Sequence, residues 1–164
     1  ENLTTKEPDL SFVNRVDSMD SDADVVVVFG GTNDFGHGDA KLGTFESRDP
    51  YTFYGAMHVL CEKLINRFPN ADILFMTPLH RCSEDEVSKE NGLPEETNLA
   101  GYVSIIREVA EFYGLPVLDL FSTSGLQPKV DIIKETYMPD GLHPSDAGAL
   151  RIALRLMGFL QTLQ

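Results

Sequence analysis

The 164-residue sequence has few cysteines, few basic residues and no long apolar run. Its two cysteines, Cys61 and Cys82, are too few for a disulfide framework and lack the spacing of metal ligands. No segment approaches the roughly 18 apolar residues of a membrane-spanning helix. The 13 Lys and Arg stand against 26 Asp and Glu, a net charge of −13. This balance argues against nucleic acid or an anionic membrane as a partner, because both bind through basic side chains.

The remaining composition, 42% apolar and 24% charged, is typical of a globular protein, and the length fits one domain over residues 1–164. Short apolar segments predict strands over 24–29, 71–77 and 115–120. The first of these is apolar at nearly every position, so we expect it to be buried on both faces of a parallel sheet.

Helical patterns separate the predicted strands. We expect a helix capped by Asp49, a second capped by Thr97 and ended by Gly114, and a short amphipathic piece over 10–19. A further helix follows Pro144. The inward-facing stripes are expected to be Phe53, Met57, Leu60, Leu64 and Phe68; Leu99, Val103, Ile106, Ala110 and Tyr113; and Leu150, Leu154, Met157 and Leu160. This alternation of helices and strands predicts an α/β fold with a parallel sheet.

The turn Gly31-Thr32-Asn33-Asp34 directly follows the first predicted strand. Glycine allows a sharp turn there, which leaves the amide of Asn33 at the carboxyl edge of the sheet. Such an amide can donate a hydrogen bond to a developing oxyanion. The alternative is an ordinary turn, in which Asn and Gly are common.

A second motif, Asp140-Gly141-Leu142-His143, precedes the last predicted helix. A carboxylate three residues before a histidine can orient the imidazole and stabilise its charged form, which is the support that a general base needs. The alternative is a helix-entry turn that happens to contain a histidine.

The other histidines are weaker candidates for a functional site. His58 falls within a predicted helix and His80 just after a strand, while His37 lies among Asp34 and Asp39 in a segment that only weakly suggests a metal site. We therefore expect no metal. The polar stretch over 81–96 is interpreted either as a lid over a substrate or as a solvated insertion.

Together, the G-x-N-D and D-x-x-H motifs resemble two conserved blocks of the SGNH (GDSL-type) hydrolase family. The resemblance implies a three-layer α/β/α sandwich of flavodoxin-like type, a Ser–His–Asp triad and an oxyanion hole, with no cofactor. It implies that His143 is the base, Asp140 its orienting carboxylate and Asn33 an oxyanion donor. Gly31, Thr32 and Asp34 would form the rest of the oxyanion loop.

The chain departs from the family in one respect, because the upstream G-D-S block with the nucleophile and the following glycine block are absent. Val16-Asp17-Ser18 has no strand before it, so we do not assign Ser18 as the nucleophile. We expect the chain to be the C-terminal part of the domain, with its N-terminal strands missing. No basic segment followed by an apolar one opens the chain. A cytoplasmic location is expected, and secretion stays open because Glu1 is not expected to be the natural beginning.

The sequence thus predicts a serine esterase or acyl hydrolase that acts on a small-molecule ester: a lipid, a short-chain acyl ester or an acetylated sugar. An N-terminal fragment or a second protomer is expected to complete the sheet. Two alternatives are a non-catalytic module that binds a small ligand or carbohydrate, and a nucleotide-binding domain. The nucleotide-binding domain is disfavoured because Lys41 stands where G-x-G-x-x-G requires glycine, and no G-K-[ST] motif occurs.

Overall fold

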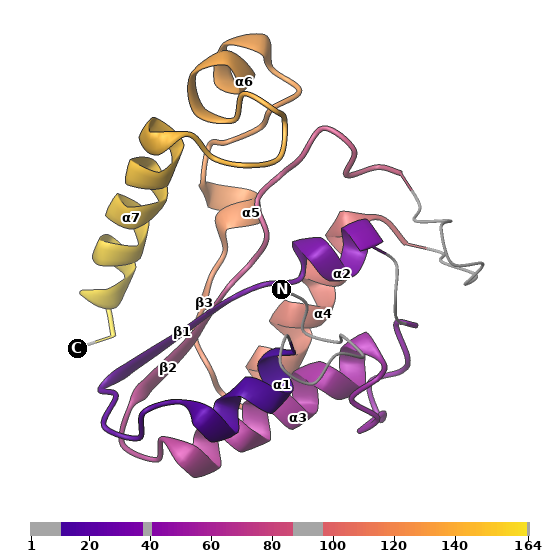
Figure 1. Ribbon diagram of the computed structural model, residues 1–164, viewed down its shortest axis with the longest axis vertical. Helices are drawn as coiled ribbons and strands as arrows, with labels where there is room; N and C mark the ends of the chain where they lie inside the picture. Colours follow the sequence, from indigo (N-terminus) through magenta and orange to yellow (C-terminus); the bar gives the residue numbers. More distant parts are fainter. Residues whose placement is uncertain (1–10, 38–40, 87–96, 164) are drawn as a thin grey trace.

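The computed structural model describes residues 11–37, 41–86 and 97–163. They form a parallel sheet of three strands in the spatial order β1 (Val25–Phe29), β2 (Asp72–Met76) and β3 (Val117–Leu118). Helices α1 (Phe12–Arg15), α3 (Phe53–Arg67) and α4 (Leu99–Phe112) lie on one side of the sheet, and α7 (Asp146–Leu160) lies on the other (Figure 1). The predicted α/β architecture with a parallel sheet is confirmed.

Shorter elements complete the described part of the chain. They are the 3-10 helix η2 (Val16–Ser18), α2 (Thr32–His37), α5 (Leu120–Thr123) and α6 (Asp131–Tyr137). The helix expected over 10–19 is therefore only the short pair α1 and η2. The strand expected over 115–120 is reduced to two residues, because Asp119 instead caps α5 by accepting a hydrogen bond from the backbone N–H of Ser122.

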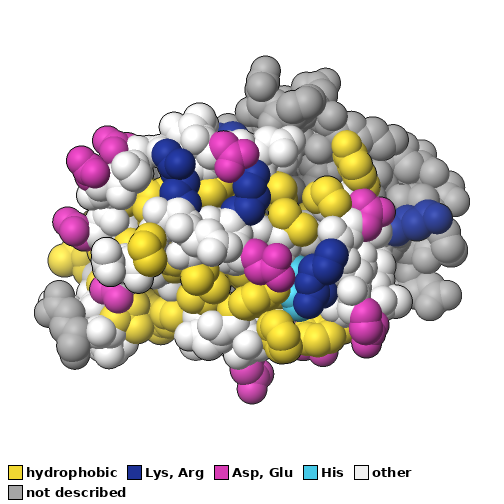
Figure 2. Space-filling model, turned by 90° about the horizontal axis from the view of Figure 1, so that it is seen from below, with side chains coloured by type: hydrophobic (Ala, Val, Ile, Leu, Met, Phe, Trp, Pro, Cys, Tyr) yellow, Lys and Arg dark blue, Asp and Glu magenta, His cyan; other side chains and the backbone are white. Residues whose placement is uncertain are grey.

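Helix α3 supplies a large part of the core. Its predicted stripe, Phe53, Met57, Leu60, Leu64 and Phe68, is at most 2% exposed. The predicted start at Asp49 is wrong. The carbonyl of Asp49 instead closes a turn by accepting the N–H of Thr52 at 3.0 Å, and Thr52 then caps the helix. On the face that includes α1 and α3, apolar side chains reach the surface in patches between acidic and basic ones (Figure 2).

Helix α4 follows its prediction closely. It begins after Asn98, whose side chain accepts the N–H of Ala100, rather than after Thr97. It ends before Gly114, where a φ of +66° suits glycine. Cys61 of α3 is a buried free thiol, as expected, and burial raises its pKa to about 12.

The inward stripe predicted for α7 is wrong at three of its four positions. Leu150, Leu154 and Met157 are 61%, 58% and 58% exposed. Helix α7 has apolar residues on two faces, and the other face packs on a second core cluster under it. That cluster is built from Leu74, Met76, Leu79, Leu118, Leu120, Leu126 and Met138, with Ile152, Leu156, Phe159 and Leu160 packed against it.

Strand β1 is buried on one face only, contrary to the expectation. Val26 and Val28 are buried, whereas Val25, Val27 and Phe29 are 43%, 40% and 43% exposed. The reason is that the cluster beneath α7 contains side chains of β2 and β3 and none of β1. Within the described residues, β1 also pairs with β2 alone.

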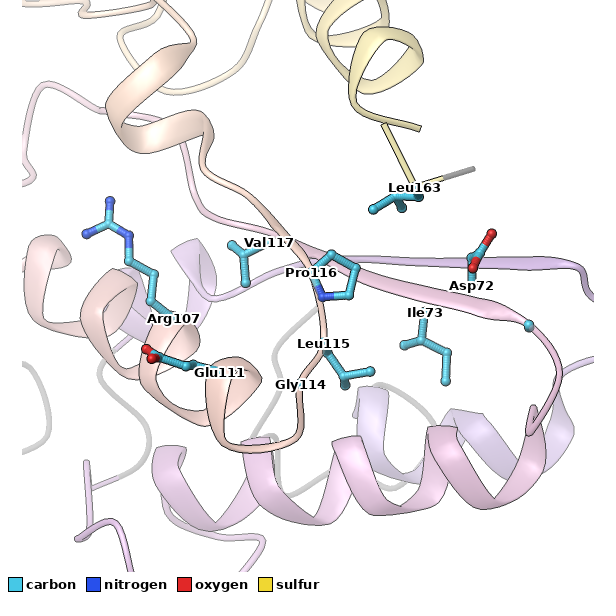
Figure 3. A pocket seen from close by; sticks show the side chains of 10 residues that line it. Asp72, Ile73, Arg107, Glu111, Gly114, Leu115, Pro116, Val117 and Leu163 are labelled. Carbon is cyan, nitrogen blue, oxygen red and sulfur yellow. The ribbon is translucent and has the colours of Figure 1, made fainter. Parts of the chain in front are cut away.

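The amino ends of β2 and β3 border an open groove of about 710 Å³ (Figure 3). Arg107 at its side donates to Asp119 at 2.6 Å and to Ser122 at 2.9 Å, so its charge is already matched. The groove lies at the end of the sheet opposite to the two sequence motifs, which follow the carboxyl end of β1 and precede α7.

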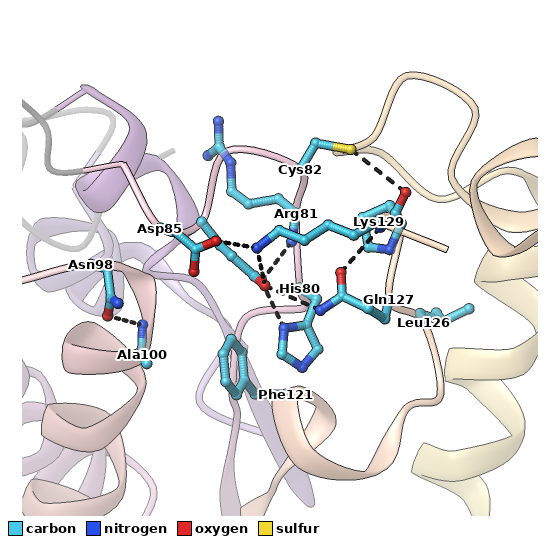
Figure 4. A network of polar contacts seen from close by, with 12 residues as sticks. His80, Arg81, Cys82, Asp85, Asn98, Ala100, Phe121, Leu126, Gln127 and Lys129 are labelled. Atoms are coloured by element: carbon cyan, nitrogen blue, oxygen red, sulfur yellow. Dashed lines mark hydrogen bonds and ion pairs between the residues drawn. The ribbon is translucent and has the colours of Figure 1, made fainter. Parts of the chain in front are cut away.

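A buried carboxylate organises the segment that follows β2 (Figure 4). Glu84 is 7% exposed. It accepts hydrogen bonds from Nδ1 of His80 at 2.7 Å, the backbone N–H of Arg81 at 3.2 Å, Nε2 of Gln127 at 3.1 Å and Nζ of Lys129 at 3.0 Å. Burial raises the pKa of this carboxyl, but the four donors outweigh burial and the net shift is downward.

The core assignment can be tested on two apolar side chains. Leu74 is completely buried on β2, so Leu74→Ala should lower the free energy of unfolding by about 2–5 kcal/mol. Ile132 on α6 is 64% exposed, so Ile132→Ala should change it by less than about 0.5 kcal/mol. Urea unfolding measures both values. Equal losses in the two variants would contradict the packing described here.

The lowered pKa of Glu84 also predicts how stability changes with pH. Its charged form stabilises the fold above the reference pKa of 4.5, and this contribution is lost as the pH falls through the lower pKa of the folded state. Glu84→Gln should therefore lower stability at pH 7 by about 1.5–3 kcal/mol, and the difference from the parent should shrink below pH 4.5. Thermal melts between pH 7 and pH 3 measure it, with the exposed Glu135→Gln as control. A difference that is constant with pH would show that the charge of Glu84 is not involved.

Candidate active site

The two sequence motifs meet at the carboxyl ends of β1 and β2, although Asn33 and His143 are 143 − 33 = 110 positions apart. Both residues line a pocket of about 190 Å³. Its walls are mainly apolar, and it is lined by Phe29, Gly30, Thr32, Asn33, Pro78, Leu79, Leu142, His143 and Pro144. The arrangement places an amide and an imidazole around one small hydrophobic space.

The first motif is a turn that requires glycine. Gly31 has a φ of +102°, and a Cβ there would lie 3.1 Å from Cδ1 of Ile106. Helix α2 begins immediately afterwards and brings Thr32 and Asn33 to the pocket. Gly31 and Asp34, which the family resemblance also assigns to this loop, are buried and do not line the pocket.

The second motif orients the imidazole of His143. Oδ2 of Asp140 lies 2.7 Å from Nδ1 of His143, while Oδ1 accepts the backbone N–H groups of Leu142 at 2.8 Å and His143 at 2.7 Å. The hydrogen bond from the His143 side chain, followed by the two from the backbone, lowers the pKa of the Asp140 carboxyl well below its usual value. An ionised Asp140 holds the proton of His143 on Nδ1 and leaves Nε2 as the basic nitrogen.

Solvent reaches both members of this pair. The side chains of His143 and Asp140 are 76% and 54% exposed. Ser18, which has no strand before it in the sequence, lies on η2 and donates to the carbonyl of Arg15 at 2.9 Å. Among the described residues, those that line the pocket include no serine.

The segment after β2 is the part of the site that sequence reasoning missed. Residues 81–86 begin the stretch that was interpreted as a lid or a solvated insertion, and Arg81 and Cys82 of this part contact both motifs. Arg81 donates from Nη1 to the carbonyl of Thr32 at 3.3 Å, and the N–H of Cys82 donates to the carbonyl of Gly141 at 2.9 Å. The only available signal was its place directly after a predicted strand. Residues 87–96 of the same stretch lie outside the described part of the chain.

Other candidate sites are less developed. Over residues 11–37, 41–86 and 97–163, no three His, Cys, Asp or Glu side chains gather as metal ligands. His37 lies at the end of α2, and Asp39 of the weak metal motif falls outside the described residues. His58 is buried in α3, where its Nδ1 lies 3.1 Å from the hydroxyl of Tyr113.

No described helix has the length and apolar character needed to cross a membrane.

Solved structures resemble this chain over nearly its whole length. One crystal structure is 40% identical with a TM-score of 0.85, and the match covers 98% of this chain and 75% of the other. A protein from Lactobacillus plantarum is 30% identical with a TM-score of 0.84, covering 98% and 76%. The lipase/acylhydrolase from Enterococcus faecalis is 22% identical with a TM-score of 0.54, covering 85% and 62%, and this likeness concerns the fold alone.

No curated protein matches the chain significantly. The family model of the GDSL-like lipases and acylhydrolases, however, matches residues 4–151, which include both motifs and every strand of the sheet. The match to this family model agrees with the fold, with the position of the two turns at one edge of the sheet and with the pair formed by Asp140 and His143. The chain belongs to the GDSL-like lipase/acylhydrolase family of hydrolases.

Proposed function

We propose that the protein is a serine esterase that cleaves a carboxylic ester with a short acyl group. The observation that carries this proposal is the meeting of Asn33 and the Asp140–His143 pair around one apolar pocket. A general base beside an amide donor is the arrangement that acyl transfer needs, because a proton must be removed and an oxyanion stabilised at neighbouring points.

In this mechanism, a serine hydroxyl attacks the ester carbonyl carbon while Nε2 of His143 takes its proton. The carbonyl oxygen becomes an oxyanion that accepts a hydrogen bond from the amide of Asn33. When the tetrahedral intermediate collapses, the C–O bond to the alcohol breaks and His143 gives its proton to the leaving oxygen. Water then hydrolyses the acyl-enzyme with His143 again acting as base, and Asp140 stays ionised throughout.

We propose further that the serine is supplied by a segment upstream of Glu1, which also adds a strand beside β1 and covers the exposed face of this strand. Four observations support this. Among the described residues β1 pairs on one side alone, and its apolar face at Val25, Val27 and Phe29 is exposed. The exposed stripe of α7 is also apolar, and the two more similar solved chains are longer than this one. An exposed apolar strand edge is normally covered or protected in a stable protein. In the described part of the chain no strand pairs with the other edge of β1, and β1 contains no Lys or Pro that would protect this edge.

The pocket walls support a small substrate. A space of about 190 Å³ with Pro78, Leu79, Leu142 and Pro144 around it suits a short acyl chain, since a dry cavity of about 150 Å³ holds a molecule the size of benzene. A short-chain acyl ester or an acetylated sugar therefore fits better than a long-chain lipid. The absence of serine among the described lining residues favours one alternative, a module that binds such a ligand without cleaving it.

The esterase proposal predicts activity only in the extended protein. A protein that includes the upstream coding sequence should hydrolyse p-nitrophenyl acetate, and His143→Ala should reduce kcat by about 10⁴-fold or more. The 164-residue chain alone should show negligible hydrolysis. His37→Ala is the control, because His37 does not line the pocket. Full activity of the 164-residue chain that is abolished by Ser18→Ala would contradict the upstream nucleophile, and an inactive extended protein that binds acetylated ligands would establish the binding module.

The role of Asn33 has its own expected signature. Asn33→Ala should lower kcat by about 10²–10³-fold with little change in KM, because the amide binds charge that develops only in the transition state. Asn66→Ala is a matched control, since Asn66 lies on α3 and its side chain donates to the carbonyl of Glu62. Steady-state kinetics on p-nitrophenyl acetate separates the two constants. A change in KM alone would assign Asn33 to substrate binding.

The proposed upstream segment can be detected without any substrate. In the extended protein, the surface formed by Val25, Val27 and Phe29 should be covered, so 1-anilinonaphthalene-8-sulfonate should bind it much less than it binds the 164-residue chain. The shorter chain should also aggregate or unfold at a lower temperature, because its apolar face is open. Equal dye binding and a cooperative, monomeric melt of the shorter chain would contradict the proposal.

A further inference from the structure

Consecutive residues after β2 connect the two turns that carry the proposed catalytic groups. Pro78 and Leu79 form part of the pocket wall. Arg81 then contacts the turn that holds Asn33, and Cys82 contacts the turn that holds His143. The distance between the amide and the imidazole therefore depends on how this short segment is held.

Arg81 makes three contacts with its guanidinium group. Nη1 donates to the carbonyl of Thr32 at 3.3 Å, Nε donates to Oγ of Ser83 at 3.1 Å, and Cζ lies 5.4 Å from the ring centroid of Phe35. Thr32 and Phe35 both belong to α2 and lie on either side of Asn33. Arg81 itself does not line the pocket, so it touches the support of Asn33 rather than the space for a substrate.

Glycine in α2 makes room for this contact. A Cβ at Gly36 would lie 2.8 Å from Nη1 of Arg81, a separation at which one of the two groups must move. The backbone of Arg81 is fixed from the other side, because its N–H donates to the buried carboxylate of Glu84 at 3.2 Å. The backbone of Arg81 is therefore held in the segment after β2 (Figure 4), while its side chain reaches α2.

We infer that Arg81 is a positioning residue that holds α2, and with it the amide of Asn33, at a fixed distance from His143. This rests on the proposed function for the role of Asn33. An oxyanion donor is effective only when its position is set before the charge develops. A displacement of about 1 Å is enough to lower a rate by about 10²-fold. Lysine cannot replace Arg81 fully, because its ammonium lacks the planar group that stacks on a ring while donating sideways.

Three variants of the intact gene product, including any sequence upstream of Glu1, test this role. Gly36→Ala keeps every polar group, favours the helical state of α2 and pushes the guanidinium away. Arg81→Ala removes the guanidinium, and Arg81→Lys keeps the charge. All three should lower kcat on p-nitrophenyl acetate by about 10–100-fold with KM within about twofold, and Arg81→Lys should lose least.

Matched controls separate positioning from general damage. Gly158→Ala introduces the same change into α7, where nothing lies within 4 Å of the added Cβ, and it should leave kcat unchanged. Arg48→Ala removes an arginine whose guanidinium donates to the carbonyls of Phe45 and Ser47 on a surface turn. A fall in kcat for Gly36→Ala at an undiminished melting temperature cannot come from loss of folded protein. A rise in KM at constant kcat in any of the three Arg81 or Gly36 variants would overturn the inference.

A second readout does not depend on esterase activity. The amide of Phe35 donates to the carbonyl of Gly31 at 3.2 Å and reports on the closure of this turn. Its hydrogen exchange should become at least about tenfold faster in Arg81→Ala and faster to a smaller extent in Arg81→Lys, while the exchange of α4 stays constant. Unchanged exchange at Phe35 overturns the positioning role, whether or not the parent is an esterase. An inactive parent with faster exchange in the variants overturns only the proposed function. If Arg81→Ala does not fold, the exchange rate of the Phe35 amide in Arg81→Lys decides: faster exchange supports the positioning role, and unchanged exchange overturns it.

Discussion

The carboxyl edge of the sheet depends on the ionised side chain of Glu84. A buried carboxylate is unfavourable unless donors surround it, and four donors from two separate parts of the chain do so here. Gln127 and Lys129 come from the segment before α6, whereas His80 and Arg81 follow β2. Because all four must approach one carboxylate, the two segments are held together, and the pocket wall at Leu79 is held with them.

The proposed catalytic groups at the same edge stand on little regular structure. Asn33 stands on a six-residue helix after a glycine turn, and His143 lies in a turn that its own neighbour Asp140 closes with three hydrogen bonds. The geometry of the two turns is set by local hydrogen bonds and by contacts with the segment after β2, while α3 and α4 hold the strands that present them.

The features predictable from the sequence were those with local causes. The apolar stripe of α3 repeats every three or four residues, and the turns at Gly31 and Asp140 carry the G-x-N-D and D-x-x-H motifs. The helix and the two turns could therefore be located from the sequence alone. The orientation of α7 could not, because Leu154 and Leu156 are equally apolar and only a tertiary partner selects the face that packs. The roles of Arg81 and Glu84 were hidden for another reason: their partners Thr32 and Lys129 are 49 and 45 positions away, and a polar run without periodicity resembles a solvated loop.

The close approach of Cys82 to Gly141 affects how chemical probes of this protein are interpreted. Gly141 has a φ of +77°, and a Cβ there would lie 2.5 Å from Sγ of Cys82, so the exposed thiol occupies the space beside the turn that carries His143. A reagent that alkylates Cys82 would add bulk directly beside that turn and would press on it. Inactivation by a thiol reagent would then reflect a steric effect on the histidine loop, and it would not identify the enzyme as a cysteine hydrolase.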